Sequence, residues 1–280
     1  METNRIKRLY KFASLDSAKR IIIGGKLKFT KPFDFNDPFD CNIERLTFDV
    51  SKTDEEFKIY EKRIREKARA EHGDRIKELN WAELYKRVQI GKIKRSKICS
   101  FSTINDHPLL WSHYGDKHLG ACLIFDNTVA IGERFKDEKK FKLGIEGLVE
   151  YKKFKKVNFC ESRINALAHL FCVKGRDWEY EKEYRMITFD LDNEYIDFEP
   201  NFLKGIIFGM KVTNREIEAF KKDVASVSNA MEFKVAVKKD ESLKIINWDC
   251  PGELFSKETR VIGLSTDPLI KGLFERLGSE

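Results

Sequence analysis

Short apolar runs alternate with polar turns over the first forty residues, and their spacing predicts both strands and a helix. Residues 9–12 alternate as a strand, and the apolar positions of residues 14–23 predict a helix that Ser14 caps and two glycines end. Residues 27–30 predict a second strand. Residues 31–40 are too rich in aromatic side chains for a solvated connector, so we expect this loop to pack on the protein.

Residues 51–90 change character, because apolar residues recur there at helical intervals among many Glu, Lys and Arg residues. Gly73 divides the pattern, which predicts two helices. Acidic and basic residues are interleaved throughout, and this favours a solvated helical insertion over a nucleic-acid-binding arm. We place the insertion at about residues 51–96.

The remaining periodicity predicts an α+β fold. Further strands are expected at residues 98–103, 120–125, 147–151, 186–189, 205–208, 233–237 and 243–248, and further helices at 108–114, 161–173 and 214–227. Strands outnumber what parallel crossovers require, so we expect a split or strongly bent, mostly antiparallel sheet. We predict a single domain over residues 1–250 and a weakly patterned tail over residues 251–280, with a short helix near its end at 269–277.

Composition and charge narrow the class of protein. The 280 residues are 41% hydrophobic and 35% charged, which is enough apolar material for a large core. Apolar stretches such as residues 21–23 are far too short to cross a bilayer, and the charged start of the chain shows no signal-peptide pattern. These features predict a cytoplasmic protein without a membrane span. The net charge of +7 is compatible with a polyanionic partner.

Several function classes are excluded by missing motifs. Six cysteines lie far apart with no C-x-x-C pair, so we expect reduced thiols, several of them buried, and no disulfide framework or structural zinc. The sequence has no P-loop and no G-x-G-x-x-G after a strand, which removes P-loop NTPases and Rossmann dehydrogenases. A G-x-S-x-G elbow is also missing, and this disfavours α/β-hydrolases.

Three carboxylates crowd together just before the strand at 186–189. Glu179, Glu181 and Glu183 alternate, and in extended backbone they would share one face. Their repulsion would raise at least one pKa unless a cation intervenes, and such crowding suits a site that stabilises positive charge. An exposed sheet edge that carries charges to prevent pairing is the alternative.

Two further segments could hold a ligand. Residues 99–103 place hydroxyl groups at a strand end, where they can bind a polar ligand or pair across strands. Trp111, His113 and Tyr114 can build an aromatic wall for a flat ring or pack in the core. The other histidines stand at no metal-ligand spacing with a carboxylate, so no metal site is predicted.

Five segments together resemble a widespread bacterial family that is catalogued only as a domain of unknown function. The segments are residues 9–12, 35–40, 99–102, 111–114 and 178–185, and the resemblance extends over about residues 8–250. The family supplies no activity by itself.

The order of three motifs is also similar, more distantly, to that of ADP-ribosyltransferases. That family has a strand with an Arg or His that orients NAD, then a Ser-Thr-Ser-like strand, then an E-x-E before a later strand. Here Lys11 takes the first place, residues 100–103 the second, and Glu181 with Glu183 the third. The resemblance implies that NAD is a substrate, and that the fold is ADP-ribosyltransferase-like. A lysine cannot make the planar bidentate contact of an arginine.

The resemblance also implies roles for individual residues. Glu183 would stabilise the oxocarbenium-like cation that forms when nicotinamide leaves, and Glu181 would orient or deprotonate the acceptor. Contacts with NAD are implied for Tyr10, Lys11, Asn36, Ser100, Ser102, Thr103, Trp111, His113 and Tyr114. An Asx turn before Pro38 explains Asn36 and Asp37 equally well.

The implied function is transfer of ADP-ribose to a macromolecular acceptor, protein or nucleic acid, by a toxin or anti-phage effector that an antitoxin could bind. We expect Glu183→Gln to abolish NAD turnover with little loss of stability.

Two alternatives stay open. Asp126, Glu150 and Lys152 resemble the core of metal-dependent restriction-type nucleases. A non-catalytic partner-binding module would instead pair the glutamates with Arg185 and nearby lysines.

Overall fold

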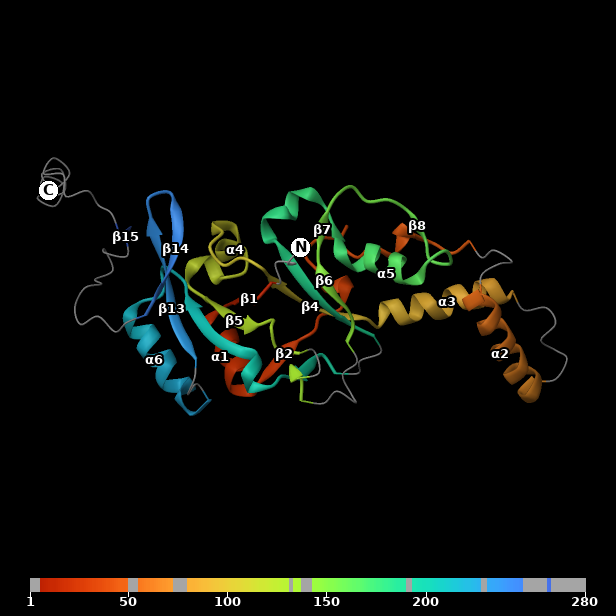
Figure 1. The fold of residues 1–280 in the computed structure, drawn as a ribbon, viewed down its shortest axis with the longest axis horizontal. Coiled ribbons are helices and arrows are strands. Elements are labelled where there is room, and N and C mark those ends of the chain that lie inside the picture. Colours follow the sequence, from red (N-terminus) through yellow and green to blue (C-terminus); the bar gives the residue numbers. More distant parts are fainter. Residues whose placement is uncertain are drawn as a thin grey trace, which may run out of the picture. The chain divides into compact units, whose positions relative to one another are not determined.

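The computed structural model describes residues 6–49, 55–72, 80–130, 133–136, 143–189, 193–227, 231–248 and 261–262. The chain divides into two units, and each draws on separate stretches of sequence (Figure 1). The first unit contains residues 1–25, 103–130 and 199–280, and the second contains residues 26–102 and 131–198. Both units combine helices with mostly antiparallel strands, which confirms the predicted α+β class. A single domain and an ADP-ribosyltransferase-like fold stay predictions.

The strands of the first unit lie in the order β14-β13-β12-β5-β1. These are β1 (Arg8–Ala13), β5 (Ala121–Asp126), β12 (Leu203–Phe208), β13 (Glu232–Lys239) and β14 (Ser242–Asn247). Neighbours are antiparallel except β12 and β13, and the short β15 (Val261–Ile262) adds to β13 in parallel. Five of the six residues of β5 are buried, because this strand has a neighbour on each side and is covered on both faces.

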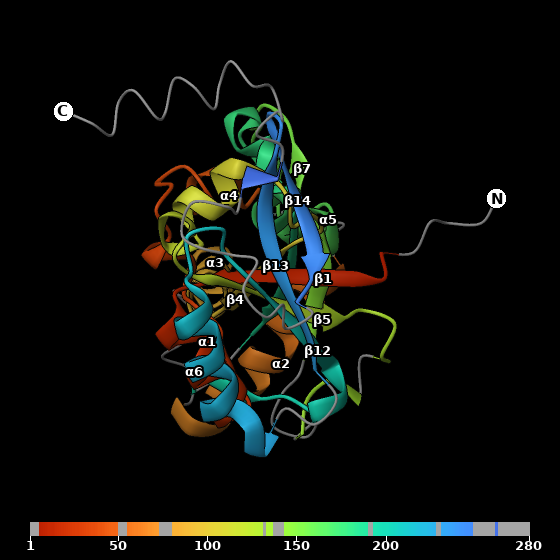
Figure 2. The same cartoon turned by 90° about the vertical axis from the view of Figure 1, so that its left-hand side faces the viewer.

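Helices of the first unit begin and end where capping chemistry predicts. They are α1 (Leu15–Gly24), α4 (Pro108–His113) and α6 (Asn214–Val224). Ser14 accepts a hydrogen bond from the Ser17 backbone at the start of α1, and Gly25 ends that helix with a φ of 59°. Thr213 and Glu216 form a capping box at the start of α6. Helices α1 and α6 lie side by side in both views (Figures 1 and 2).

Trp111 on α4 is part of the core of the first unit. Its side chain is fully buried, its ring meets Phe12 edge-on with centroids 5.0 Å apart, and its indole N–H donates to the Asn105 carbonyl at 2.8 Å. The turn after α4 brings the backbone of Gly120 against β1, where a Cβ atom would lie 2.2 Å from the Ala13 carbonyl oxygen. Only glycine fits at this close approach.

The described residues of the second unit form a three-stranded antiparallel group and three small strand pairs. The group has the order β4 (Lys97–Ser102), β10 (Glu183–Thr188), β6 (Leu143–Leu148). The antiparallel pair is β2 (Lys26–Lys28) with β11 (Tyr195–Asp197), and the parallel pairs are β3 (Leu46–Thr47) with β8 (Val157–Asn158) and β7 (Glu150–Tyr151) with β9 (Val173–Lys174).

The two helices predicted within residues 51–90 are confirmed as α2 (Glu55–His72) and α3 (Trp81–Lys94). Gly73, which marks their division in the sequence, lies outside the described residues, as does the helix predicted at 269–277. Helix α5 (Arg163–Cys172) presents Leu170 and Phe171 to a core that includes Ile98 of β4 and Ile187 of β10. Across the described residues, no helix has both the length and the apolar composition of a bilayer-crossing segment.

Candidate functional site

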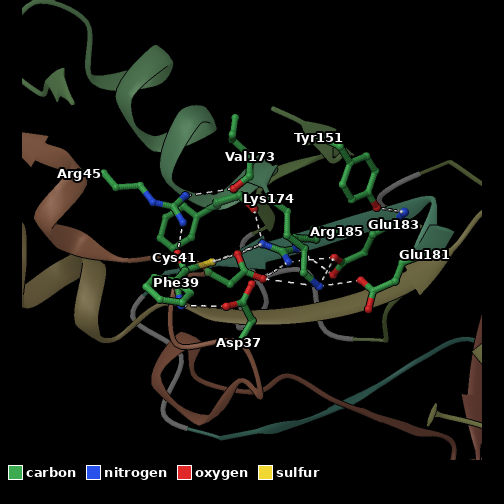
Figure 3. A network of polar contacts seen from close by, with 12 residues as sticks. Asp37, Phe39, Cys41, Arg45, Tyr151, Val173, Lys174, Glu181, Glu183 and Arg185 are labelled. Carbon is green, nitrogen blue, oxygen red and sulfur yellow. Dashed lines mark hydrogen bonds and ion pairs between the residues drawn. The ribbon is translucent and has the colours of Figure 1, made fainter. Parts of the chain in front are cut away.

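Five charged side chains gather in the interior of the second unit (Figure 3). This charge cluster consists of Asp40, Lys174, Glu181, Glu183 and Arg185, and no member is more than 5% exposed. Its members come from three places along the chain: the loop at 35–40, β9, and residues 181–185, which span the turn before β10 and the start of that strand. Three carboxylates face two cations, so the cluster carries one excess negative charge.

Arg185 joins two of the carboxylates. Its Nε and Nη2 atoms donate to the two oxygens of Glu183 at 2.8 and 2.9 Å, and its Nη1 and Nη2 atoms donate to the two oxygens of Asp40 at 3.0 and 2.5 Å. Nη1 also donates to the Phe171 carbonyl at 2.7 Å. The planar guanidinium group can bridge two carboxylates in this way, whereas an ammonium group cannot.

Lys174 faces all three carboxylates of the cluster. Its Nζ atom lies 2.6 Å from Glu181, 3.5 Å from Glu183 and 3.8 Å from Asp40. Burial would lower the pKa of Lys174, but the neighbouring Glu183 and Glu181 carboxylates outweigh burial and raise it. The same ammonium group lies 4.6 Å from the centre of the Trp178 ring, so Lys174 connects the cluster with an aromatic side chain.

Glu183 is ionised despite its burial. Burial raises the pKa of its carboxyl group, but Arg185, then Lys174 and a hydrogen bond from the Ser100 side chain, lower it to about 2. The Glu183 backbone N–H donates to the Tyr151 hydroxyl at 2.8 Å, and burial raises the pKa of that phenol. The cluster therefore holds a fixed, charged carboxylate at the first residue of β10.

The backbone around the glutamates differs from the predicted extended conformation. Residues Arg176–Glu181 form a 3-10 helix, Lys182 has a left-handed φ of 45°, and β10 begins only at Glu183. The three glutamates consequently do not share one face, and that prediction is wrong. Glu179 points to solvent and pairs with Lys182 at 3.2 Å, while Glu181 and Glu183 enter the cluster.

Two of the segments that the sequence singles out meet in the second unit. Ser102 at the end of β4 is the register partner of Glu183, and its hydroxyl donates to the Glu181 carbonyl at 2.6 Å. The loop at 35–40 reaches the cluster through Asp40. Its Asp37 carboxylate accepts from the backbone N–H of Phe39 at 2.9 Å, an Asx turn, and within the described residues Asn36 makes no hydrogen bond to the cluster.

The other candidate residues for NAD contact lie in the first unit. Tyr10 and Lys11 are half-buried on β1, Trp111 is buried, His113 is exposed, and the Tyr114 ring lies 6.2 Å from that of His113. Thr103 is half-buried just after β4. Their contacts with NAD stay predictions.

The sequence does not predict Asp40 and Lys174 as site residues. The sequence offers only two weak signals for them. Lys174 lies two residues after the end of the apolar helix α5, and Asp40 ends an aromatic loop. The sequence predicts Arg185 only as a partner of the glutamates in a binding module.

The residues of the nuclease alternative make separate ion pairs. Asp126 in the first unit pairs with Arg8 at 3.1 Å and with Lys204 at 3.7 Å. Glu150 and Lys152 in the second unit pair with each other. Within the described ranges, no three His, Cys, Asp or Glu side chains are grouped so that they could hold a metal ion.

The cysteines of the described residues are free thiols, as predicted. Cys41, Cys99 and Cys122 are buried, whereas Cys160 and Cys172 are half-buried. Burial raises the pKa of Cys41 and Cys122 well above its usual range, and raises that of Cys172 to about 11. Cys250 lies outside the described residues.

Among known protein families, one model without an assigned activity matches part of this chain. A family model described as "Protein of unknown function (DUF2971)" matches residues 110–186. The match supports a domain-of-unknown-function family. The matched residues include four members of the charge cluster: Lys174, Glu181, Glu183 and Arg185. No curated protein and no solved structure matches the chain.

Proposed function

We propose that this chain consumes NAD and transfers ADP-ribose to a macromolecular acceptor, in the manner of ADP-ribosyltransferases. One observation carries the proposal: the Ser102 hydroxyl donates to the Glu181 carbonyl at 2.6 Å, and Ser102 stands opposite Glu183. The hydroxyl motif and the E-x-E motif thus come together, as the resemblance implies.

The charge of the cluster suits this chemistry. Its excess negative charge favours a cationic ligand, and the nicotinamide ring of NAD is cationic. A carboxylate with a pKa of about 2 is ionised at neutral pH and stabilises the positive charge that develops on the ribose. Arg185 fixes the direction of that carboxylate by binding both of its oxygens.

The proposed reaction breaks the bond between ribose C1′ and the nicotinamide nitrogen, and the electron pair leaves with nicotinamide. A nucleophilic oxygen or nitrogen of the acceptor then forms a new bond to C1′, and its proton passes to Glu181, which acts as general base. Glu181 lies 2.6 Å from Lys174, and the ammonium group stabilises its charged form before the proton arrives.

Release of nicotinamide from NAD tests the proposal. Purified protein is incubated with NAD and cell lysate, and nicotinamide is measured by chromatography. We expect release by the wild type and by Glu179→Gln, which removes an exposed carboxylate, and at least a hundredfold slower release by Glu183→Gln. Circular dichroism at the assay temperature verifies that each variant is folded. Undiminished release by folded Glu183→Gln would refute the role of this carboxylate.

A non-catalytic binding module is the second candidate. It is favoured by the ion pairs themselves, since both oxygens of Glu183 already bind Arg185. A folded wild-type protein that releases no nicotinamide in any lysate would favour the module over the transferase.

The biological role belongs to the same proposal. We propose a toxin or anti-phage effector that acts in the cytoplasm and that an antitoxin partner holds in check. Expression of the wild type should arrest bacterial growth, and expression of Glu183→Gln at the same level should not.

A further inference from the structure

A basic and aromatic surface lies beside the charge cluster in the second unit. The segment between β7 and β8 exposes four lysines around Phe154, which is itself 37% exposed: Lys152, Lys153, Lys155 and Lys156. Lys152 pairs with Glu150, whereas no ion pair within the described residues engages the other three. Their positive charge is therefore available to a polyanion.

Three aromatic rings lie close together next to these lysines. Gly175 has no side chain, and a Cβ atom there would lie 3.9 Å from both the Phe154 ring and the Trp178 ring, so these two rings flank the glycine. The Trp178 and Tyr180 rings follow with centroids 6.3 Å apart and planes 35° from parallel. The Arg45 guanidinium supports Phe154 from one side, 3.3 Å from its ring centre.

Rigid contacts hold this surface in place. Arg45 donates to the carbonyl groups of Val173 and Phe39, and it is itself buried (Figure 3). Lys174 contacts the Trp178 ring and also the Glu181 carboxylate, so a ligand on the rings would lie near the proposed catalytic carboxylates. A fixed row of rings costs less conformational entropy on binding than flexible side chains do.

We propose that residues 152–156, Trp178 and Tyr180 form a binding surface for single-stranded nucleic acid. Exposed lysines contact the phosphates, and the rings stack on unpaired bases, which duplex bases could not do. An acidic protein segment would use the lysines but would gain nothing from a row of rings. If the strand is also the acceptor of ADP-ribose, that part of the inference rests on the proposed function.

Binding of labelled oligonucleotides tests the surface directly. Fluorescence anisotropy is measured without NAD, with 12-nucleotide single-stranded RNA and DNA of the same sequence and with a duplex. The patch variant replaces Lys153, Lys155 and Lys156 by Gln. Its matched control replaces three exposed lysines of the first unit by Gln and has the same net charge: Lys238, Lys239 and Lys244.

We expect the single strand to bind more tightly than the duplex. The patch variant should lower the slope of log affinity against log salt by about 2, since it removes three lysines and each single-strand phosphate contact contributes about 0.7. The control variant should keep the wild-type slope. Phe154→Leu should weaken binding about tenfold through lost stacking, whereas Phe154→Tyr should retain it. The two substitutions keep the side chain packed under Arg45, so a difference between them reports on the ring.

Three results would overturn the inference: no binding of either single strand, equal loss in the patch and control variants, or equally tight binding of a polyglutamate peptide of the same charge. Because these measurements need no turnover, they stand apart from the proposed function. A protein that binds the oligonucleotide and releases no nicotinamide would refute the transferase alone, and the reverse result would refute the binding surface alone.

Discussion

Replacement of Glu183 by Gln should destabilise the fold as well as remove the carboxylate that we propose to be catalytic. The pKa of this carboxyl group is about 2 in the folded chain and 4.5 in the reference state that represents the unfolded chain. The difference of about 2.5 pH units, at about 1.4 kcal/mol for each, corresponds to about 3 kcal/mol of stability at pH 7. The loss of stability is therefore larger than the sequence predicts, because no local pattern shows that Arg185 and Lys174 bind this carboxylate in the interior.

The pH dependence gives the sharper test. The folded-state pKa lies below that of the unfolded state, so the stabilisation is present above about pH 5 and is lost as the pH falls toward 2. For the wild type it should decrease from about 3 kcal/mol at pH 7 to about 1 kcal/mol at pH 3. The neutral amide of Glu183→Gln lacks this dependence, so wild type and variant should converge in acid.

Urea unfolding at pH 7, 5, 4 and 3, followed by tryptophan fluorescence, measures the difference. Glu179→Gln is the matched control, because it removes the same charge from an exposed pair with Lys182 and should cost less than about 1 kcal/mol. Equal stability of wild type and Glu183→Gln at pH 7, or a gap between them that stays constant down to pH 3, would refute the electrostatic reasoning.

Three further substitutions test other parts of the structure by urea unfolding at pH 7. Asp40→Asn removes one carboxylate that Arg185 binds in the interior and should cost about 3 kcal/mol; a loss below 1 kcal/mol would contradict the cluster. Gly120→Ala should cost about 2 kcal/mol or more, since the new Cβ atom would lie 2.2 Å from the Ala13 carbonyl, and wild-type stability would refute that close approach. Thr213→Ala removes the cap of α6 and should cost about 1 kcal/mol, whereas Thr213→Ser should keep most of it.

Most elements of the fold could be predicted because their signals are local. The cap of α1 by Ser14, the apolar period of α5 and the continuous apolar run of β5 each depend on residues within one element. The order of the strands could not be predicted, since β1 pairs with β5 over more than one hundred residues of sequence and no local pattern specifies that partner.

The candidate site could be predicted only in part, for the same reason. Crowding identified Glu181 and Glu183 and predicted a raised pKa unless a cation intervenes; Lys174 pairs with both glutamates and Arg185 with Glu183. Asp40 lies 145 residues from Arg185 in the sequence, so their contact leaves no trace in spacing. The backbone reversal at Lys182 was missed because lysine is a rare residue at a positive φ.

The interleaving of the two units constrains how this chain can be made and divided. The sequence passes from one unit to the other after residues 25, 102, 130 and 198. Neither unit can be expressed as a contiguous fragment, and a ribosome must synthesise β12 before β5 acquires its second neighbour. During translation the early strands of the first unit consequently remain incompletely paired. A premature stop anywhere before residue 203 leaves that unit without β12, β13 and β14.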